Sequence, residues 1–289
     1  MSDISLAVIG GSGLYDMAGL ADVEEIAVDT PFGKPSDTIT VGMLHGRKLA
    51  FLPRHGRGHV LTPSEVPYRA NILALKMLGV RYIVSVSACG SLREDYEPGH
   101  IVIPDQLVDH TKGLRERSFY GRGLVAHIGV ADPFSPELSV ALAGAVRKAG
   151  GTVHEGGTFI TIEGPRFSTS GESNLFRKWG MSIIGMTTSP EAFLAAEAEI
   201  AYAVMAHVTD YDVWHETEDN VTVEMVIRIL LQNTKLAQDG ISYLVQHMAD
   251  WEGSYPVHHG LRDALITDRS RIPAEVKEAL APLVGKYLD

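Results

Sequence analysis

The chain contains one cysteine, Cys89, among its 289 residues. A single thiol excludes a disulfide within the chain and favours a reducing compartment, so the cytoplasm is the expected location. Long apolar runs are also missing, because none approaches the roughly 18 residues that a membrane-spanning helix needs. The first residues have the pattern of a strand, and we expect neither a signal peptide nor a membrane anchor.

Positive charge is scarce as well. Lys and Arg total 25 against 36 Asp and Glu, which gives a formal net charge of −11. The basic residues are scattered and form no stripe that could follow a phosphate backbone, so nucleic-acid binding is not expected. The expected partners are small molecules.

The sequence is rich in alternating strand and helix patterns, without repeats or linkers. Hydrophobic residues make up 45% of the chain, which predicts one large α/β domain over residues 1–289, with a large mixed central sheet flanked by helices. Strand patterns cover residues 6–9, 37–44, 48–52, 82–86, 99–108, 152–162, 182–185 and 201–208. Helical patterns cover residues 68–78, 135–149, 171–179, 190–198, 222–247 and 273–287.

Five of the strand patterns end in a short polar or glycine-rich cluster. In open α/β sheets, ligands bind outside the carboxyl ends of the strands, so these clusters are candidates for one shared pocket. Together they supply backbone amides, hydroxyls, a guanidinium and two carboxylates, which suits an anion and a polar organic ligand. The clusters are Gly10-Gly11-Ser12-Gly13, Arg54-His55-Gly56, Ser87-Ala88-Cys89-Gly90, Met186-Thr187-Thr188 and Thr209-Asp210-Tyr211-Asp212.

Two of the clusters suit an anion. The glycines and hydroxyl of residues 10–13 are typical of a turn that cradles phosphate, although an ordinary tight turn explains them equally well. The turn lacks both the Lys-Ser/Thr of a P-loop and the complete G-x-G-x-x-G fingerprint. Arg54 could bind phosphate in bidentate fashion, and a surface ion pair is the alternative.

Metal binding by His55 and His59 and nucleophilic catalysis by Cys89 are two possible functions that the surrounding residues do not favour. His55 and His59 are four residues apart, a spacing that suits a metal only on a helix, and Gly56 and Gly58 argue against a helix there. We therefore expect no metal. Cys89 could act as a nucleophile beside a histidine, but a small buried thiol between packed turns is the favoured interpretation.

Three further features suit a flat organic ligand. Phe167, in the turn of residues 163–168, could stack on a base, whereas a Glu163 to Arg166 pair would make the turn purely structural. Met186 suits either a ligand contact or core packing. Asp210 and Asp212 follow a strand, where either could cap a helix. A carboxylate pair in a partly dry pocket can also have one pKa raised, which leaves one acid able to donate a proton.

Taken together, these residues resemble the trimeric purine nucleoside phosphorylases. The resemblance runs over roughly residues 5–250 and implies a phosphorylase/hydrolase-like α/β fold. It is most detailed for members that act on 5′-methylthioadenosine. The matching motifs are Gly10-Gly11-Ser12-Gly13-Leu14, Asp29-Thr30-Pro31-Phe32-Gly33-Lys34-Pro35-Ser36, Arg54-His55-Gly56-Arg57, Ser87-Ala88-Cys89-Gly90-Ser91-Leu92, Ile162-Glu163-Gly164-Pro165-Arg166-Phe167-Ser168, Met186-Thr187-Thr188 and Thr209-Asp210-Tyr211-Asp212.

The resemblance assigns roles to residues. Those implied to bind phosphate are Ser12, Arg54, His55, Ser87, Ala88 and Thr187. Those implied to bind the base and ribose are Cys89, Gly90, Phe167, Ser168, Met186, Asp210 and Asp212. Val223 and Val226 would form the 5′-methylthio pocket together with His127 from a neighbouring subunit. The expected assembly is therefore a homotrimer, or a dimer of trimers.

The implied reaction is phosphorolysis of 5′-methylthioadenosine to adenine and 5-methylthioribose 1-phosphate. Inorganic phosphate would be a co-substrate, Asp212 would donate a proton to purine N7, and no cofactor is expected. Two aspartates favour a 6-amino over a 6-oxo purine. Methylthioinosine, inosine or guanosine, 5′-deoxyadenosine and adenosine stay open as substrates, as do a hydrolytic nucleosidase and a non-catalytic nucleoside-binding protein. The resemblance fades beyond about Asp250, and a helical C-terminal extension at about 270–289 could cap the 5′ pocket or a subunit interface.

Overall fold

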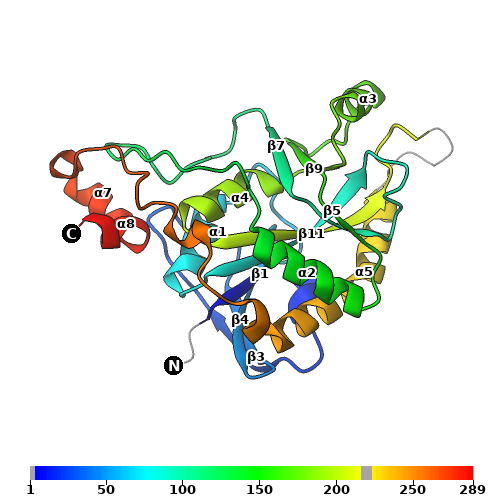
Figure 1. Ribbon diagram of the computed structural model, residues 1–289, viewed down its shortest axis with the longest axis horizontal. Helices are drawn as coiled ribbons and strands as arrows, with labels where there is room; N and C mark the ends of the chain where they lie inside the picture. Colours follow the sequence, from blue (N-terminus) through cyan, green and yellow to red (C-terminus); the bar gives the residue numbers. More distant parts are fainter. Residues whose placement is uncertain (1–3, 216–222, 289) are drawn as a thin grey trace.

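A computed structural model of the chain describes residues 4–215 and 223–288. Its centre is one mixed sheet that carries helices on both faces, as the sequence predicts (Figure 1). The strands among the described residues are β1 Leu6–Gly10, β2 Ala21–Ile26, β3 Ile39–Leu44, β4 Arg47–Pro53, β5 Tyr82–Ser91, β6 Ile101–Ile103, β7 Gln106–His110, β8 Val153–Glu155, β9 Thr158–Ile162, β10 Ile183–Gly185 and β11 Ala201–Asp210.

Two helical layers cover the sheet. The α-helices are α1 Tyr68–Met77, α2 Pro136–Lys148, α3 Ser170–Lys178, α4 Thr188–Glu197, α5 Val223–Gln246, α6 Met248–Trp251, α7 Ala274–Ala279 and α8 Ala281–Leu288. Short 3-10 helices are η1 Ser12–Tyr15, η2 Pro256–His259 and η3 Arg269–Arg271. Figure 1 shows α2 and α5 on one side of the sheet and α1 and α4 on the other. No helix among the described residues is long and apolar enough to cross a membrane.

Apolar side chains of β11 point alternately to the two faces of the sheet, and helices cover both faces. Tyr202 and Val204 pack into the core beneath α1 and α4, whereas Ala203 and Met205 pack into the core beneath α2 and α5. Successive side chains of a strand point to opposite faces, so an uninterrupted apolar run needs a partner layer on each side. All ten residues of β11 are buried.

Strand directions decide which strand ends share an edge of the sheet. β1 runs parallel to β4 and β5, and β5 runs parallel to β11, so the carboxyl ends of these four strands lie together. β10 was expected at the same edge, but it runs antiparallel to β5. It pairs with the last part of β5, at Gly90 and Ser91, and a Cβ built on its last residue, Gly185, would lie 3.5 Å from the carbonyl oxygen of Ala88. The end of β10 therefore still reaches the site.

Three predicted elements are divided in the structure. The strand expected over residues 99–108 becomes β6 and β7, with Pro104 between them, because proline has no N–H to donate to a ladder. The strand expected over residues 152–162 breaks at Gly156 and Gly157, whose φ angles are +83° and +100°. The C-terminal helix expected over residues 273–287 divides into α7 and α8 at Leu280, just before Pro282.

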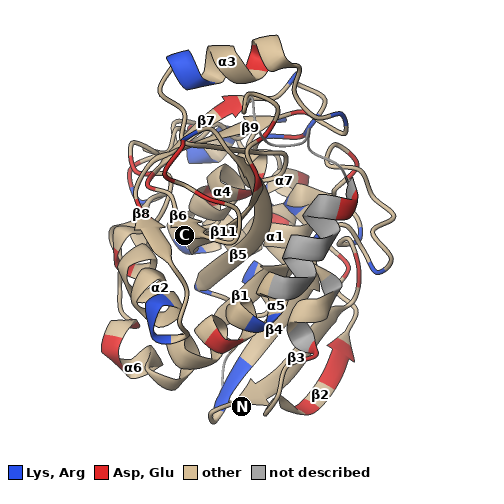
Figure 2. Cartoon of the chain, turned by 90° about the vertical axis from the view of Figure 1, so that its right-hand side faces the viewer, with Lys and Arg blue, Asp and Glu red and all other residues tan. Residues whose placement is uncertain are grey.

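The helices α3 and α8 are held by specific hydrogen bonds and ion pairs. Thr169 and Glu172 form a reciprocal capping box at the start of α3, and the acidic first turn and basic last turn of this helix appear as its red and blue ends in Figure 2. At the other end of the molecule, the buried carboxylate of Glu199 accepts a hydrogen bond from the Tyr287 hydroxyl at 2.6 Å and pairs with Lys286 at 2.6 Å. These contacts hold α8 against the body of the protein.

Candidate active site

The ends of the four parallel strands are in direct contact. The backbone N–H of Arg54 donates to the carbonyl oxygen of Gly10 at 3.0 Å, which joins β4 to β1. A Cβ built on Gly10 would lie 3.1 Å from the carbonyl oxygen of Val86, on β5. The Thr209 hydroxyl donates to the carbonyl oxygen of Cys89 at 3.2 Å, which joins β11 to β5. The clusters predicted at these strand ends are therefore neighbours in the fold.

Arg54 is held by buried partners. Its Nε and Nη2 donate to the two carboxylate oxygens of Glu191 at 2.7 and 2.8 Å, and Nη2 also donates to the Ser85 hydroxyl at 2.6 Å. Nη1 donates to the carbonyl oxygen of Val86 at 3.3 Å. These contacts use four of the five N–H groups of a guanidinium and leave one on Nη1. The bidentate edge that we assigned to phosphate thus binds Glu191, and the alternative of a surface ion pair is wrong because both residues are buried.

The ring of His55 is neutral near pH 7. Its Nδ1 lies 2.8 Å from the carbonyl oxygen of Leu61, and since a carbonyl only accepts, Nδ1 carries the proton. Burial, together with the charge of Arg54, lowers the pKa of His55 to about 4. Its ring stacks on that of His59 at 4.2 Å. The Nε2 atom is consequently an acceptor, so it suits only a protonated phosphate oxygen, whereas the backbone N–H of His55 suits an unprotonated one.

Hydroxyls complete the anion side of the site. The Ser87 oxygen is buried and has no hydrogen-bond partner in the described part of the chain. Thr187 is buried at the start of α4, where its non-helical backbone brings the chain from β10 into the helix. The side chain of Ser12 lies outside the described residues, as do those of Val223 and Val226. Ala88 lies on β5 between Ser87 and Cys89, partly exposed.

Asp210 is the last residue of β11 and is buried. One of its oxygens accepts from the Thr209 hydroxyl at 2.6 Å, and the other accepts from the backbone N–H of Asp212 at 2.7 Å. Burial raises the pKa of Asp210 to about 6, against these hydrogen bonds, which favour the charged form. The two aspartates are thus linked through backbone, and neither is a helix N-cap in the described structure.

Asp212 is buried at an unusual backbone conformation, with φ +53°. Burial raises its pKa, although the hydroxyls of Ser173 and Ser168 oppose the shift. Its Oδ2 atom has no hydrogen-bond partner among the described residues. A buried, unpartnered carboxylate oxygen costs free energy unless a ligand binds it. Asp212 therefore lies beside the Ser168 and Ser173 hydroxyls with one carboxylate oxygen that a ligand could also bind.

Gly90 has no side chain, and the two aspartates pack closely against it. A Cβ built on Gly90 would lie 3.0 Å from Oδ1 of Asp210 and 3.2 Å from the Cβ of Asp212. It would also lie 3.1 Å from Cγ2 of Ile184. The glycine of the Ser87–Gly90 cluster is thus required for the carboxylates to pack against β5.

Glu163 and Arg166, in the turn at residues 163–168, do not pair with each other. Glu163 accepts from Arg115 at 3.0 Å, whereas Arg166 donates to Glu172 at 2.7 and 2.8 Å, so the alternative of a turn held by a Glu163 to Arg166 pair is wrong. Phe167 is 36% exposed, and Ser168 beside it is buried close to Asp212. Phe167 is therefore accessible to a ligand at the edge of the site.

Met186 lies against this turn. A Cβ built on Gly164 would be only 2.6 Å from the Met186 sulfur, so the side chain crosses the backbone of the turn. Met186 is only partly buried, so its burial does not decide between core packing and a ligand contact. It thus brings the end of β10 against the turn that carries Phe167 and Ser168.

Arg115 and Glu191 are the two site residues that the sequence analysis missed. The Arg115 side chain is fully buried and contacts the backbone on both sides of the site. Glu191 lies in the first turn of α4 and also accepts from the Tyr202 hydroxyl at 2.7 Å. Both are charged residues in segments that look solvent-exposed in sequence, and only their long-range partners reveal their burial.

Cys89 is packed in the core. Burial raises its pKa well above the usual value, and the nearby Asp210 charge acts in the same direction. A thiol with a raised pKa forms little thiolate, so the favoured interpretation of a buried structural thiol is confirmed over a nucleophile. No group of three or more His, Cys, Asp or Glu side chains in the described ranges could hold a metal ion.

His127 is exposed on an extended segment away from the strand ends. Its backbone N–H donates to the carbonyl oxygen of Ala264 at 2.9 Å, and Ala126 bridges to Leu265 beside it. Pro273 packs on the same segment, since a Cβ built on Gly123 would lie 2.7 Å from its ring. The segment that carries His127 is thus held by residues 264–265 and Pro273 of its own chain.

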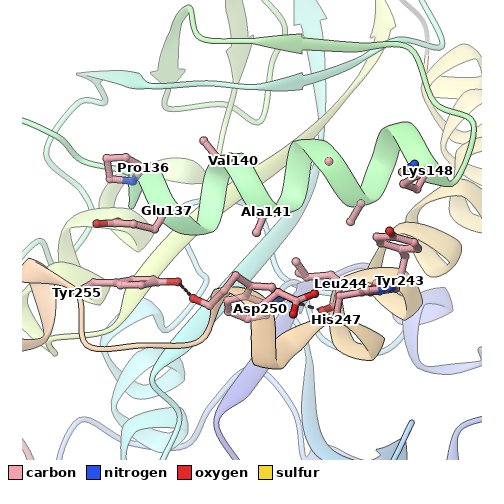
Figure 3. A pocket seen from close by; sticks show the side chains of 13 residues that line it. Pro136, Glu137, Val140, Ala141, Lys148, Tyr243, Leu244, His247, Asp250 and Tyr255 are labelled. Atoms are coloured by element: carbon pink, nitrogen blue, oxygen red, sulfur yellow. Dashed lines mark hydrogen bonds between the residues drawn. The ribbon is translucent and has the colours of Figure 1, made fainter.

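A groove of about 730 Å³ lies between α2 and the end of α5 with α6, away from the strand ends (Figure 3). Small residues on α2, Ala141 and Gly144, leave the space, and Tyr243 and Trp251 line the other side. No residue of the five clusters lines it. A smaller cavity of about 150 Å³ borders the 163–168 turn and includes Ser168. The groove is therefore separate from the five strand-end clusters, whereas the smaller cavity borders one of the turns predicted for the site.

Comparisons with known proteins agree with this geometry. The family model of the phosphorylase superfamily matches residues 5–245. The S-methyl-5′-thioadenosine phosphorylase of Chloroflexus aurantiacus is 55% identical over 287 residues, covering 99% of each chain. The enzyme of the same name from Geobacter sulfurreducens is 55% identical over 283 residues, covering 98% of this chain and 99% of the relative.

Solved structures are similar over the whole chain. A methylthioadenosine phosphorylase from an antarctic soil metagenomic library superposes with a TM-score of 0.93 at 49% identity, covering 98% of this chain and 99% of the other. Methylthioadenosine phosphorylase from Schistosoma mansoni in complex with adenine superposes with a TM-score of 0.81 at 35% identity, covering 98% of each chain. The similarity extends to α7 and α8, which lie beyond the residues matched by the family model, so the expectation that the resemblance fades beyond about Asp250 is wrong.

Proposed function

The chain belongs to the phosphorylase superfamily, and from that premise we propose that it is a pentosyltransferase that cleaves 5′-methylthioadenosine with inorganic phosphate, giving adenine and 5-methylthioribose 1-phosphate. The observation that carries the proposal is the position of two buried carboxyl groups with raised pKa, Asp210 and Asp212, beside strand ends that present Arg54 and free hydroxyls. One side of the site suits an anion, and the other suits the edge of an aminopurine. A nucleoside and phosphate together satisfy both.

The anion side would bind phosphate beneath the ribose. The donors are the remaining N–H of Arg54, the unpartnered hydroxyl of Ser87 and the hydroxyl of Thr187. Ser12, the backbone N–H of His55 and the backbone beside Ala88 would complete the shell. Because the Arg54 charge is already paired with Glu191, we expect phosphate to be held by several directed hydrogen bonds and not by one strong ion pair.

The other side would bind adenine. Phe167 would stack on the base, Ser168 would line its edge, and Met186 would pack on the ribose, with Cys89 and Gly90 forming the adjoining wall. Asp212 would donate a proton to N7, and Asp210 would accept from the 6-amino group; burial raises the pKa of both carboxyl groups. A carboxylate repels a 6-oxo group, so methylthioinosine and inosine should be poorer substrates.

The reaction separates charge along the C1′–N9 bond. As that bond breaks, positive charge develops on the sugar and negative charge on the purine. The phosphate dianion stabilises the sugar and then forms the new C1′–O bond, while Asp212 transfers its proton to N7. Phosphate loses one proton on forming the ester, which restores the proton that Asp212 donated. The mechanism needs neither a covalent enzyme intermediate nor a metal or other cofactor.

The 5′ end of the substrate would be bound between subunits. Val223 and Val226 would contact the methylthio group, and His127 of a neighbouring subunit would close the pocket. We therefore propose a homotrimer whose subunit is one domain with the C-terminal helices α7 and α8 appended. A buried free thiol at Cys89 fits the proposed location in the cytoplasm.

The first test is incubation with 5′-methylthioadenosine, with and without phosphate, followed by chromatography of the released base. Parallel reactions contain methylthioinosine, inosine, adenosine and 5′-deoxyadenosine. Adenine release that depends on phosphate supports the proposal. Preference for methylthioinosine would contradict the roles of Asp210 and Asp212, and cleavage without phosphate would identify a hydrolytic nucleosidase.

The second test concerns the acid. Asp212→Asn keeps the size of the side chain but cannot donate an acidic proton, so kcat should fall by about 10²–10⁴-fold. Binding of adenine, measured by calorimetry, shows whether the variant still recognises the base. Full turnover by a variant that still binds substrate would rule out Asp212 as the acid.

A further inference from the structure

Arg115 occupies a segment without regular structure between β7 and α2, yet its side chain is completely buried. Neighbouring Leu114 is 73% exposed and Arg117 is partly exposed, so the burial of Arg115 is not a property of the segment as a whole. Burying a guanidinium is costly unless its donors are satisfied. Its partners therefore indicate what this residue is for.

The partners fall in two loops. We call residues 186–189, which run from the end of β10 into the first residues of α4, the phosphate loop, and residues 163–168, after β9, the base loop. Nη1 of Arg115 donates to the carbonyl oxygens of Met186 at 2.6 Å and Ser189 at 2.7 Å, on either side of Thr187. Nη2 donates to the carbonyl oxygen of Glu163 at 2.7 Å, and Nε donates to the Glu163 carboxylate at 3.0 Å.

One rigid, planar group thus connects both loops. The phosphate loop carries Thr187, and the base loop carries Phe167 and Ser168. Glu163 in turn accepts from the Ser64 hydroxyl and from the backbone N–H of Lys112, which fixes the base loop to the same point. A displacement of one loop must therefore be transmitted through the guanidinium to the other, or must break several hydrogen bonds.

We propose that Arg115 is a positioning residue that couples the two loops, so that phosphate binding strengthens binding of the base, and base binding strengthens binding of phosphate by the same factor. The proposal rests on the proposed function, because it takes the two loops as the phosphate and base sides of one site. Arg115 itself touches neither ligand. It acts by holding backbone carbonyls in a fixed relation.

The chemistry requires arginine and not merely a cation. The guanidinium presents donors along two edges of one plane, and those edges face different loops. The ammonium of lysine is a compact point charge on a flexible stem and cannot span the same four oxygens in one geometry. Arg115→Lys should keep the buried positive charge beside Glu163 and lose the simultaneous contact with both loops.

The experiment measures coupling directly. The dissociation constant of adenine is determined by calorimetry without phosphate and with saturating phosphate, and the ratio of the two values is the coupling factor. For the wild-type protein we expect a factor of about 5 or more, in the range usual for coupled sites. For Arg115→Lys we expect a factor near 1, while adenine binding without phosphate changes by less than about threefold.

The matched control is Arg117→Lys, two residues along the same segment. Arg117 is partly exposed, pairs with Asp109 at 3.7 Å and contacts neither loop, so its variant should keep the wild-type coupling factor. If Arg115→Lys does not fold, Glu163→Gln weakens the same connection from the side of the base loop and should also lower the factor. Circular dichroism and thermal unfolding establish that each variant is folded.

Three outcomes would overturn the proposal. The first is a folded Arg115→Lys protein that keeps the wild-type coupling factor. The second is a variant whose affinities for adenine and phosphate fall together at an unchanged factor, which would indicate a merely structural role. The third is a wild-type factor of 1. Phosphate-dependent release of adenine from methylthioadenosine would still support the proposed function in each case, so the failures of the two proposals are distinguishable.

Discussion

Arg54 and Glu191 form a two-point ion pair in the interior, with the two carboxylate oxygens 2.7 and 2.8 Å from Nε and Nη2 and with exposures of only 3% and 0%. The residues are 137 positions apart, at the end of β4 and in the first turn of α4. The pair fixes the guanidinium plane before any ligand arrives. It also leaves the cation nearly neutralised, so we expect an anion at this site to be recognised by directed hydrogen bonds more than by charge.

Removal of Glu191 should therefore destabilise the protein and weaken phosphate binding. Glu191→Ala leaves Arg54 as a buried unpaired charge, which should lower the free energy of unfolding by about 3–5 kcal/mol. The freed guanidinium loses its orientation, and kcat/KM for phosphate should fall by about 10²-fold. Urea unfolding and steady-state kinetics measure the two effects.

The control for Glu191 is an exposed pair. Arg93 and Asp95 lie 2.8 Å apart with side-chain exposures of 46% and 58%, and Asp95→Asn should cost less than about 1 kcal/mol. A Glu191→Ala protein as stable as this control would mean that Arg54 finds other compensation in the fold, and the role assigned to the pair would be wrong.

Asp210 should give the stability of the protein a recognisable pH dependence. Its pKa is about 6 in the folded protein and about 3.8 when unfolded, so between these values the folded state holds a proton that the unfolded state has released. The contribution is thus fully present below about pH 4 and is lost as the pH rises through 6. At about 1.4 kcal/mol per pKa unit, it amounts to about 3 kcal/mol.

The comparison that isolates this contribution is the difference between wild type and Asp210→Asn. Other groups titrate in the same window with the opposite sign, including His207, whose pKa burial lowers to about 4. The contributions of these other groups cancel in the difference in the free energy of unfolding between wild type and Asp210→Asn. Measured by urea unfolding, that difference should change by about 3 kcal/mol between pH 4 and pH 7. A difference independent of pH would show that Asp210 titrates normally in the folded protein.

Gly90 should be intolerant of even one methyl group. In Gly90→Ala the new carbon meets Asp210, Ile184 and Asp212 at 3.0–3.2 Å, so the carboxylates must move away from β5. We expect a modest loss of stability, about 1–3 kcal/mol, and a fall in kcat of about 10²-fold. Gly129→Ala is the control, because a Cβ there has no neighbour within 4 Å. Equal activity of the two variants would show that the aspartates tolerate displacement.

The arrangement of strand ends was predictable because it depends on local patterns. Apolar runs of strand length followed by polar residues put Arg54, Ser87 and Asp210 at one edge of the sheet, and parallel pairing of four strands brings them together. The direction of β10 was not predictable in this way. It depends on pairing with the far part of β5, which no local pattern encodes.

The residues that organise the site were not predictable from local patterns. Arg115 lies in a charged stretch next to Glu116 and Arg117, and Glu191 begins a helix, so both resemble solvent-facing residues. Their burial depends on partners far away in the sequence, Glu163 at 48 residues from Arg115 and Arg54 at 137 residues from Glu191. Similarly, β2 was missed because its residues are charged and mostly exposed, as is common in an edge strand.

His127 provides a test of the shared site. The extended segment that carries it is held by Ala264 and Leu265 and packs against Pro273, so the C-terminal part of the chain supports this exposed histidine. If His127 closes the methylthio pocket of a neighbouring subunit, His127→Ala removes a contact at the 5′ end only. The kcat/KM for methylthioadenosine should fall about 10-fold or more, as for other small apolar contacts, whereas that for adenosine should change less.

The assembly must be measured with the same samples, because a shared pocket exists only in an oligomer. Light scattering should give the mass of a trimer for wild type and for His127→Ala, so that a kinetic change reports the pocket and not dissociation. His259→Ala, at an exposed histidine bonded to Ser254, is the matched control and should leave the preference for the 5′ group unchanged. A wild-type protein that is fully active as a monomer would exclude a contribution from a neighbouring subunit, and the 5′ pocket would then have to be completed from within the chain.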